Sequence, residues 1–270
     1  MSFFCFDHNI NKISIESEFQ HQRSFLYGDG HFTTMKVVDG LIQFFSAHLA
    51  RLQQANERLD FNDINWKLLE LELRKLAVQM ELGFIKVHFS RGHSVRGYGQ
   101  CANINTNIFV SSDELSTPFI KETQQPKPIA LTQLTTQLGL QPLLAGIKHC
   151  NRLEQVLASV ELEKTIFTDG LVADINGNLI ETTKANVIWY QEGSWYTPLL
   201  SNAGVSGVIL NQLLEYNNII TIEKNINDVI QQAEAVFICN SLIGIQAVSS
   251  IDDRLFNTEL SSQLMRKIIL

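Results

Sequence analysis

The sequence predicts a mixed α/β protein of two domains. The chain has 270 residues, of which 45% are hydrophobic, enough for more than one core. Short strand-like runs and amphipathic helical segments follow one another along it. A polar stretch containing Pro118, Pro126 and Pro128 interrupts this pattern. We therefore expect domains at residues 1–114 and 129–270, joined by a linker at 115–128.

The N-terminal half carries both strand and helix signals. Asp39-Gly40 between two apolar runs predicts a two-residue type I′ hairpin. Ser46 is a good N-cap for a helix over 47–59, whose leucine stripe leaves out His48 and Arg51; an arginine there is ordinarily solvated. The other expected elements are a helix over 66–82 ended by Gly83 and strands over 2–6, 12–16, 84–89 and 105–111.

The C-terminal half contains further hairpin signals at Asn176-Gly177 and Glu192-Gly193. Asn151 is a plausible cap for a helix over 152–163, and helical spacing groups four of its apolar residues on one face: Leu153, Val156, Leu157 and Val160. The remaining expected elements are helices over 208–216, 226–233 and from about 260, and strands over 129–134, 171–175, 179–181, 187–190, 195–197, 219–222 and 235–239.

Charge and cysteine patterns exclude several classes of protein. The net charge is −7 and the basic residues are scattered, so neither a nucleic-acid nor a membrane-surface partner is expected. No segment has the length of a membrane span and the N-terminus lacks signal-peptide features, which predicts a soluble, cytoplasmic protein. Cys5, Cys101, Cys150 and Cys239 form no Cys-x-x-Cys pair, so neither a disulfide framework nor a metal site is predicted.

Two stretches are candidates for chemistry. Lys148 lies between an apolar run and a predicted helix start, where partial desolvation lowers the pKa of an amine and makes it nucleophilic. Taken alone, this segment favours the interpretation that Lys148 is one of many surface lysines. The loop Ser90–Gly99 gathers Arg91, Arg96, Tyr98 and three glycines, a composition suited to a carboxylate ligand or to a flexible hairpin end.

The motifs together resemble the class IV aminotransferases, the fold-type IV enzymes that use pyridoxal 5′-phosphate (PLP). The general signature is carried by residues 181–188, Thr197 and 203–208. Residues 28–34, 47–52, 90–98 and above all 146–156 resemble the branch of this family that acts as a lyase on aminodeoxychorismate. Ile188 and Leu210 depart from the family pattern, which usually has an aromatic and a basic residue there. The resemblance implies a smaller N-terminal α/β domain, a larger C-terminal α/β domain with a barrel-like sheet, and a homodimer.

The resemblance also implies roles for individual residues. Lys148 would bind the PLP aldehyde covalently and, once released, act as base and acid. Glu181 would face the pyridine nitrogen and keep it protonated. The phosphate would be bound by Arg51, Val205, Ser206, Ser241 and Leu242. A helix N-terminus beside Val205 and Ser206 suits an anion because its N–H groups and its dipole both favour negative charge.

The implied substrate is a small dicarboxylate, 4-amino-4-deoxychorismate, which would be converted to 4-aminobenzoate and pyruvate, a step of folate biosynthesis. Arg96 and Tyr98 occupy the family position for substrate recognition, Arg91 and Arg152 are further candidates, and Thr33 or Thr34 would lie near the reacting carbons. Two alternatives stay open: a branched-chain or D-amino-acid aminotransferase with the same Lys148 and Glu181, and a non-catalytic PLP-binding protein.

Overall fold

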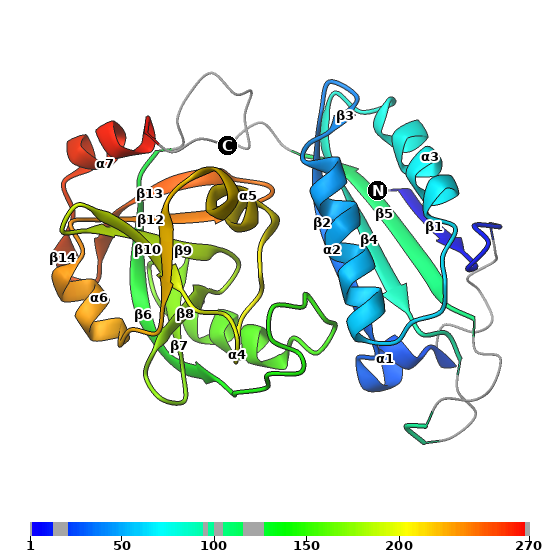
Figure 1. Ribbon diagram of the computed structural model, residues 1–270, viewed down its shortest axis with the longest axis horizontal. Helices are drawn as coiled ribbons and strands as arrows, with labels where there is room; N and C mark the ends of the chain where they lie inside the picture. The colour runs from blue at the N-terminus through cyan, green and yellow to red at the C-terminus, as the bar shows by residue number, and fades with distance from the viewer. Residues whose placement is uncertain (1, 13–20, 94–96, 100–104, 116–126, 268–270) are drawn as a thin grey trace. The chain divides into compact units, whose positions relative to one another are not determined.

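The computed structural model describes residues 2–12, 21–93, 97–99, 105–115 and 127–267. The chain divides into two compact units (Figure 1). Unit 1 comprises Met1–Phe119 together with Lys148–Asn151, and unit 2 comprises Ile120–Ile147 and Arg152–Leu270. This division puts Lys148 with the N-terminal unit, whereas the expected C-terminal domain included it. Most of the predicted linker, residues 116–126, lies outside the described residues, as does most of the expected strand 12–16.

Unit 1 is a five-stranded antiparallel sheet with three helices, in the strand order β1-β5-β4-β2-β3. Helices α2 and α3 share one apolar core with the strands, which includes Met35, Leu52, Leu69 and Ile85. The elements are β1 Ser2–Phe6, α1 Arg23–Tyr27, β2 Gly30–Val38, β3 Leu41–Ile42, α2 Phe45–Arg58, α3 Trp66–Ala77, β4 Leu82–Ser90 and β5 Asn107–Glu114.

Of the local predictions for unit 1, the hairpin turn is confirmed and the helix cap is not. The Asp39-Gly40 hairpin is confirmed, and both residues have the positive φ of a type I′ turn, 49° and 76°. The cap prediction is wrong: α2 begins at Phe45, its N-cap is Phe44, and Ser46 lies inside the first turn. His48 is fully buried although the leucine stripe excluded it.

Unit 2 is a nine-stranded mixed sheet that curls on itself, with four helices (Figure 1). The strand order is β11-β10-β9-β12-β13-β6-β7-β8, and β14 pairs with β13. The elements are β6 Ile129–Leu138, α4 Leu153–Leu162, β7 Gly170–Asp174, β8 Leu179–Thr182, β9 Asn186–Gln191, β10 Ser194–Pro198, α5 Val208–Tyr216, β11 Ile219–Ile222, α6 Ile226–Gln232, β12 Ala235–Asn240, β13 Gly244–Ile251, β14 Arg254–Leu255 and α7 Thr258–Met265.

Helix α4 exists as predicted, but the sequence pattern gives the wrong environment for its apolar face. The buried residues of α4 are Ala158 and Leu162. The apolar stripe of α4, which we define as Leu153, Val156, Leu157 and Val160, is instead 44 to 77% exposed. Asn151 does not cap the helix, because its side chain donates to the Gly28 carbonyl at 3.2 Å.

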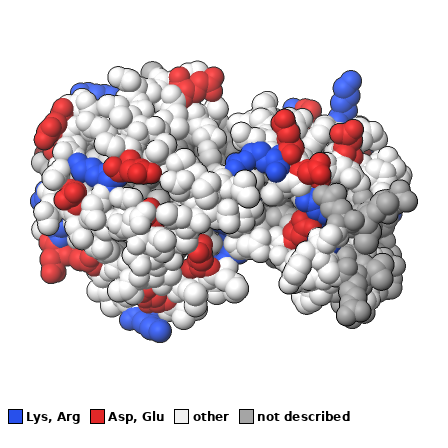
Figure 2. All heavy atoms as spheres, turned by 60° about the horizontal axis from the view of Figure 1, so that its bottom comes forward, with Lys and Arg blue, Asp and Glu red and all other residues white. Residues whose placement is uncertain are grey.

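Charged side chains are dispersed over the molecule. On the face drawn in Figure 2, acidic and basic residues are interspersed and separated by broad uncharged areas. Within the described part of the chain, no helix combines the length and apolar character needed to cross a bilayer.

Candidate active site

The backbone around Lys148 is held by hydrogen bonds on both sides of the lysine. Gly146, with a left-handed φ of 81°, donates to the Gly204 carbonyl at 2.9 Å and accepts from the Ser206 amide at 3.0 Å. The Lys148 carbonyl accepts from the Phe32 amide at 2.9 Å. Lys148 is therefore hydrogen-bonded to β2. The sequence had suggested a place at the start of α4, but α4 begins only at Leu153.

The Lys148 side chain is half-buried in unit 1. Its Nζ lies 4.8 Å from the centroid of the Phe32 ring. An aromatic face attracts an ammonium group and replaces part of its water. The contact shields part of the amine from water, whereas the attraction to the ring favours the ammonium form.

Arg51 is the second feature of unit 1. Burial lowers the pKa of its guanidinium to about 10. Its Nε is buried and has no hydrogen-bond partner among the described residues, and none of their acidic side chains pairs with it. A desolvated positive charge with an unused donor is a position suited to an anion.

One guanidinium nitrogen of Arg51 is held by Thr33, whose hydroxyl also bonds His48. Arg51 Nη2 donates to Thr33 Oγ1, and this same oxygen lies 2.7 Å from His48 Nδ1. Because Thr33 Oγ1 accepts from the arginine, its own proton is available for His48 Nδ1. Thr33 donates to Nδ1 when the neutral histidine has its proton on Nε2. Burial, together with Arg51, lowers the His48 pKa to about 3 and keeps the ring neutral.

Glu181 is the central acidic residue of unit 2. It lies on β8 and is 6% exposed. Its Oε2 accepts from the Val205 amide at 3.0 Å, and its Oε1 accepts from Gln155 Nε2 at 3.5 Å. These donors fix the direction of a buried carboxylate.

The loop before α5 is closely packed around Asn186. Asn186 Nδ2 donates to the Val205 carbonyl at 2.7 Å, and a Cβ added to Gly207 would lie 2.0 Å from Asn186 Oδ1. A Cβ at Gly207, the N-cap of α5, would therefore displace the Asn186 side chain from its bond to Val205. The Val205 amide bonds Glu181 and the Ser206 amide bonds Gly146, so neither is available for a ligand in this arrangement. The Ser206 hydroxyl donates to Asn211 Oδ1 at 2.7 Å.

Ser241 and Leu242 lie in the turn between β12 and β13. The Leu242 amide donates to Asn240 Oδ1 at 2.9 Å, which shapes this turn internally. Ser241 is half-buried.

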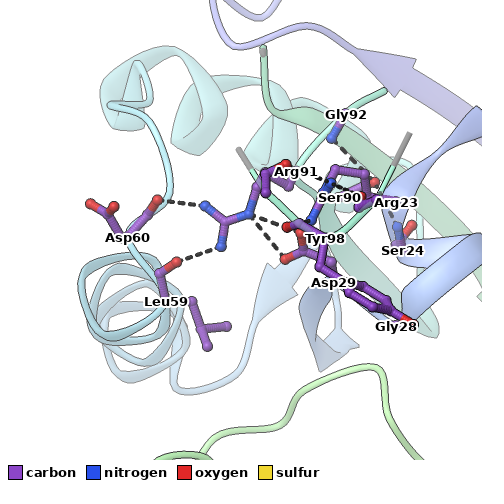
Figure 3. Close-up of polar contacts among 12 residues, drawn as sticks. Arg23, Ser24, Gly28, Asp29, Leu59, Asp60, Ser90, Arg91, Gly92 and Tyr98 are labelled. Atoms are coloured by element: carbon purple, nitrogen blue, oxygen red, sulfur yellow. Dashed lines mark hydrogen bonds and ion pairs between the residues drawn. The ribbon is translucent and has the colours of Figure 1, made fainter. Parts of the chain in front are cut away.

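The expected substrate residues fall into different settings. Arg91 is half-buried and uses its donors within unit 1: Nε bonds Asp29 at 2.9 Å, and the two terminal nitrogens bond the Leu59 and Asp60 carbonyls (Figure 3). Tyr98 is 82% exposed. Arg96 lies outside the described residues.

The other substrate candidates lie on β2 and at α4. Thr33 is fully buried, and its hydroxyl is engaged by Arg51 and His48. Its neighbour Thr34 points to the opposite face of β2 and is half-buried. Arg152 is the N-cap of α4 and donates to the Ile147 carbonyl at 3.3 Å.

Sequence reasoning missed three residues that the structure brings into these groups. His48 lies off the leucine stripe of its helix, Asn186 was only part of a motif, and Arg23 belonged to no pattern. A histidine three residues before the arginine on the same helix was the one available signal, because such spacing puts both on one side.

Comparisons with known proteins agree with the motifs. The chain matches amino-transferase class IV over residues 30–251. It is 34% identical over 234 residues to the aminodeoxychorismate lyase of Vibrio harveyi, covering 85% of both chains. It is 23% identical to the D-alanine aminotransferase of Bacillus licheniformis, covering 91% of this chain and 87% of the relative.

A solved structure is similar over nearly the whole chain. The 4-amino-4-deoxychorismate lyase of Pseudomonas aeruginosa superposes with a TM-score of 0.83 and 29% identity, covering 97% of this chain and 98% of that one. The barrel-like sheet of unit 2 and the α/β architecture of unit 1 are thus those of fold-type IV enzymes. By its motifs, its family match and its fold, this chain belongs to the class IV aminotransferases.

Proposed function

We propose that this protein is a PLP-dependent lyase that converts 4-amino-4-deoxychorismate to 4-aminobenzoate and pyruvate. The observation that carries the proposal is the agreement of two independent likenesses. The Vibrio harveyi relative and the Pseudomonas aeruginosa structure are both described as this lyase, and both cover most of the chain. An essential amine, a buried carboxylate and a buried guanidinium are the residue types that this reaction requires.

The donor set fits PLP in chemical terms. Lys148 offers an amine, Glu181 a buried acid, and Arg51 a desolvated cation with an unused Nε. These match the aldehyde, the pyridine nitrogen and the phosphate, respectively. When bound, PLP supplies an electron sink for the electron pair left by C–H cleavage next to an amine-bearing carbon.

Arg51 is the proposed phosphate ligand of unit 1. With Nη2 fixed by Thr33, the remaining donors of the guanidinium keep one orientation and can meet phosphate oxygens through charge-assisted bonds. We assign Thr33 to this positioning role, which leaves Thr34 as the threonine on β2 for the substrate side.

In unit 2 we propose Ser206 and Ser241 as hydroxyl donors to the phosphate, together with the first amides of α5. To donate, the Ser206 hydroxyl would have to leave Asn211. A helix leaves its first N–H groups without internal acceptors, and they favour an anion. The backbone amides of Val205 and Leu242 would contribute only if they left Glu181 and Asn240. Glu181, oriented by the Val205 amide, would hold a proton on the pyridine nitrogen.

Lys148 is the proposed base. Its Nζ would take the proton from C4 of the substrate, the enolpyruvyl C–O bond at C3 would break, and the released enol would take up a proton to become pyruvate. Formation of the aromatic ring of 4-aminobenzoate makes the elimination strongly downhill. The hydrogen bonds of Gly146 and Lys148 to neighbouring backbone restrict where the amine can move.

For the substrate carboxylates we propose Tyr98, Arg152 and Arg96. Arg91 was a further candidate, but its bonds to Asp29 and to the end of α2 favour a supporting role. The alternative function, a branched-chain or D-amino-acid aminotransferase, has weaker support: the likeness to D-alanine aminotransferase is 23% in identity, against 34% for the lyase.

A paired assay on the PLP-loaded protein separates these functions. It compares 4-aminobenzoate release from aminodeoxychorismate with keto-acid formation from D-alanine or L-leucine and 2-oxoglutarate. We expect aminobenzoate release to dominate. The Lys148→Ala variant should lose the covalent link to the cofactor, and its turnover should fall at least about 10³-fold. Keto-acid formation without aminobenzoate would move the protein to the transaminases, and retained turnover in Lys148→Ala would rule out its role as base.

We further propose that the protein is a cytoplasmic homodimer, in which the apolar stripe of α4 contributes to the interface. Four neighbouring aliphatic side chains remain at least 44% exposed on one helix. A contiguous apolar surface of this kind is typical of an interaction site, whereas scattered single apolar residues are not.

A further inference from the structure

Arg23 is a buried arginine at the start of α1 that neither motif nor family pattern singles out. It is 4% exposed. Its Nε donates to Asp29 Oδ2 at 2.7 Å, which forms an ion pair. Among the described residues, its other side-chain hydrogen bonds go to the segment Gly97–Gly99, so one side chain joins this segment to the body of unit 1.

The contacts to this segment are made to three consecutive backbone carbonyls. Arg23 Nη2 donates to the Tyr98 carbonyl at 2.7 Å, and Nη1 donates to those of Gly97 and Gly99 at 3.3 Å each. Figure 3 shows Tyr98 beside Arg23 and Asp29. A planar guanidinium can reach several acceptors at once, which an ammonium group cannot do from one position.

The ring of Tyr98 is held as well. It makes an edge contact with the Tyr27 ring at a centroid distance of 5.1 Å, and the Arg23 guanidinium lies 5.3 Å from that same Tyr27 ring. Tyr98 nevertheless keeps most of its side chain exposed. Among the described residues, the ring contact of Tyr98 is with Tyr27, and the exposed part of the side chain is accessible to a ligand.

The opposite end of this arrangement is anchored to regular structure. Asp29 also accepts from Arg91, which in turn bonds the carbonyls at the end of α2 (Figure 3). Two guanidinium groups thus share the Asp29 carboxylate, which holds Arg23 and Arg91 together beside Tyr98.

Glycine on both sides of Tyr98 gives the backbone little stiffness of its own. A defined Tyr98 position must therefore come from the contacts just described. We infer that Arg23 is a positioning residue for substrate recognition, which fixes Tyr98 through the three carbonyls and through Tyr27. This inference rests on the proposed function, in which Tyr98 binds the substrate.

The test compares Arg23→Gln and Arg23→Lys with the wild type, all loaded with PLP. Arg74→Lys is a matched control, because Arg74 is an exposed arginine of the same unit that pairs with Glu70. Chymotrypsin cleavage after Tyr98, followed by mass spectrometry of the fragments, reports whether the segment is held. Steady-state kinetics with aminodeoxychorismate report the effect on the substrate, and thermal unfolding verifies that each variant is folded.

In Arg23→Gln we expect the rate of cleavage after Tyr98 and the KM for aminodeoxychorismate each to rise about tenfold, because two or more charge-assisted bonds are lost. The kcat should stay within about threefold of the wild-type value. Arg23→Lys keeps the Asp29 pair and should lie between the wild type and Arg23→Gln, whereas Arg74→Lys should match the wild type. Faster cleavage with an unchanged KM would overturn the inference, as would unchanged cleavage. A wild-type protein that releases no aminobenzoate would instead overturn the proposed function, and the cleavage rates would still report on the anchor.

Discussion

Helices α2 and α4 depart from their sequence patterns in opposite directions. In α2, His48 is fully buried and Arg51 partly so, although both lie off the leucine stripe. In α4, the apolar stripe is exposed, although its spacing is that of a helix packed against a core. Polar groups that a fold buries without full pairing point to a ligand, and apolar groups that it exposes together point to a partner.

The difference shows that periodicity predicts a helix more reliably than it predicts the environment of each face. The side of α2 that carries His48 and Arg51 is closed by Thr33 of β2, a residue 15 positions away from His48 in the chain. The polar side of α4 is held by Glu161, which accepts from the amides and hydroxyls of Thr135 and Thr136 at 2.6 to 2.8 Å. Neither pairing is visible in local spacing.

The largest expected effect concerns the buried side of α2. Arg51→Gln should weaken PLP binding to the apo-protein by at least about 100-fold, because two charge-assisted bonds of about 1.5 kcal/mol or more are lost. Fluorescence titration with PLP and with pyridoxal, which lacks the phosphate, measures this. Arg58→Gln, an exposed arginine of the same helix, is the control. An equal loss for pyridoxal would show that Arg51 does not bind the phosphate.

A smaller effect is expected from the group that orients Arg51. Thr33→Val keeps the side-chain shape but removes the oxygen that bonds Arg51 and His48, so PLP affinity should fall about tenfold. Thr33→Ser, which keeps the hydroxyl, should stay close to the wild type. The same titration measures this. A Thr33→Val variant with wild-type PLP affinity would show that Thr33 does not orient Arg51 for phosphate binding.

The exposed side of α4 is tested by Leu157→Asp. We expect the dimer dissociation constant to rise at least about tenfold in sedimentation experiments, while the melting of the monomer changes little because the position is exposed. Leu71→Asp on α3, also an exposed leucine, should leave assembly unchanged. A dimer that tolerates Leu157→Asp as well as Leu71→Asp would assign the apolar stripe of α4 some other role.

Acid should affect the two helices in different pH ranges. Burial lowers the pKa of His31 to about 4 and that of His48 to about 3, from an ordinary value of 6.5. The unfolded chain then binds protons that the folded one does not, so unit 1 loses stability as the pH falls from about 6.5 toward 4.

Glu161 behaves differently. Burial raises the pKa of its carboxyl, but hydrogen bonds from Thr136 and Thr135 outweigh this effect and hold the pKa at about 2, below the ordinary 4.5. Its stabilisation is present above about pH 4.5 and is lost as the pH falls through about 2. As the pH is lowered, the hydrogen-exchange protection factors of α2 should therefore fall at a higher pH than those of α4. Glu161→Gln should weaken α4 at neutral pH, with a difference from wild type that shrinks below about pH 4.5. Simultaneous loss of protection in both helices would contradict this order.

Local chemistry in the sequence determined the elements and the reactive groups. Asp39-Gly40 and Glu192-Gly193 predict two-residue hairpin turns between strands. The structure confirms both turns, and both residues of each pair have positive φ. The alternation of strands and helices predicts the fold class. Lys148, Glu181 and Arg51 were found through motifs, since family patterns preserve the spacing of residues along the chain.

Only the tertiary structure decided how these groups are held. Thr33 and His48 meet at Arg51 through strand–helix packing, the Val205 amide reaches Glu181 from a separate loop, and Arg23 finds its carbonyls more than 70 residues away. The same holds for burial, because helical spacing defines a face but not what lies opposite it. Hydrogen bonds and packing between residues distant in sequence depend on where the chain returns, and no local pattern encodes that return.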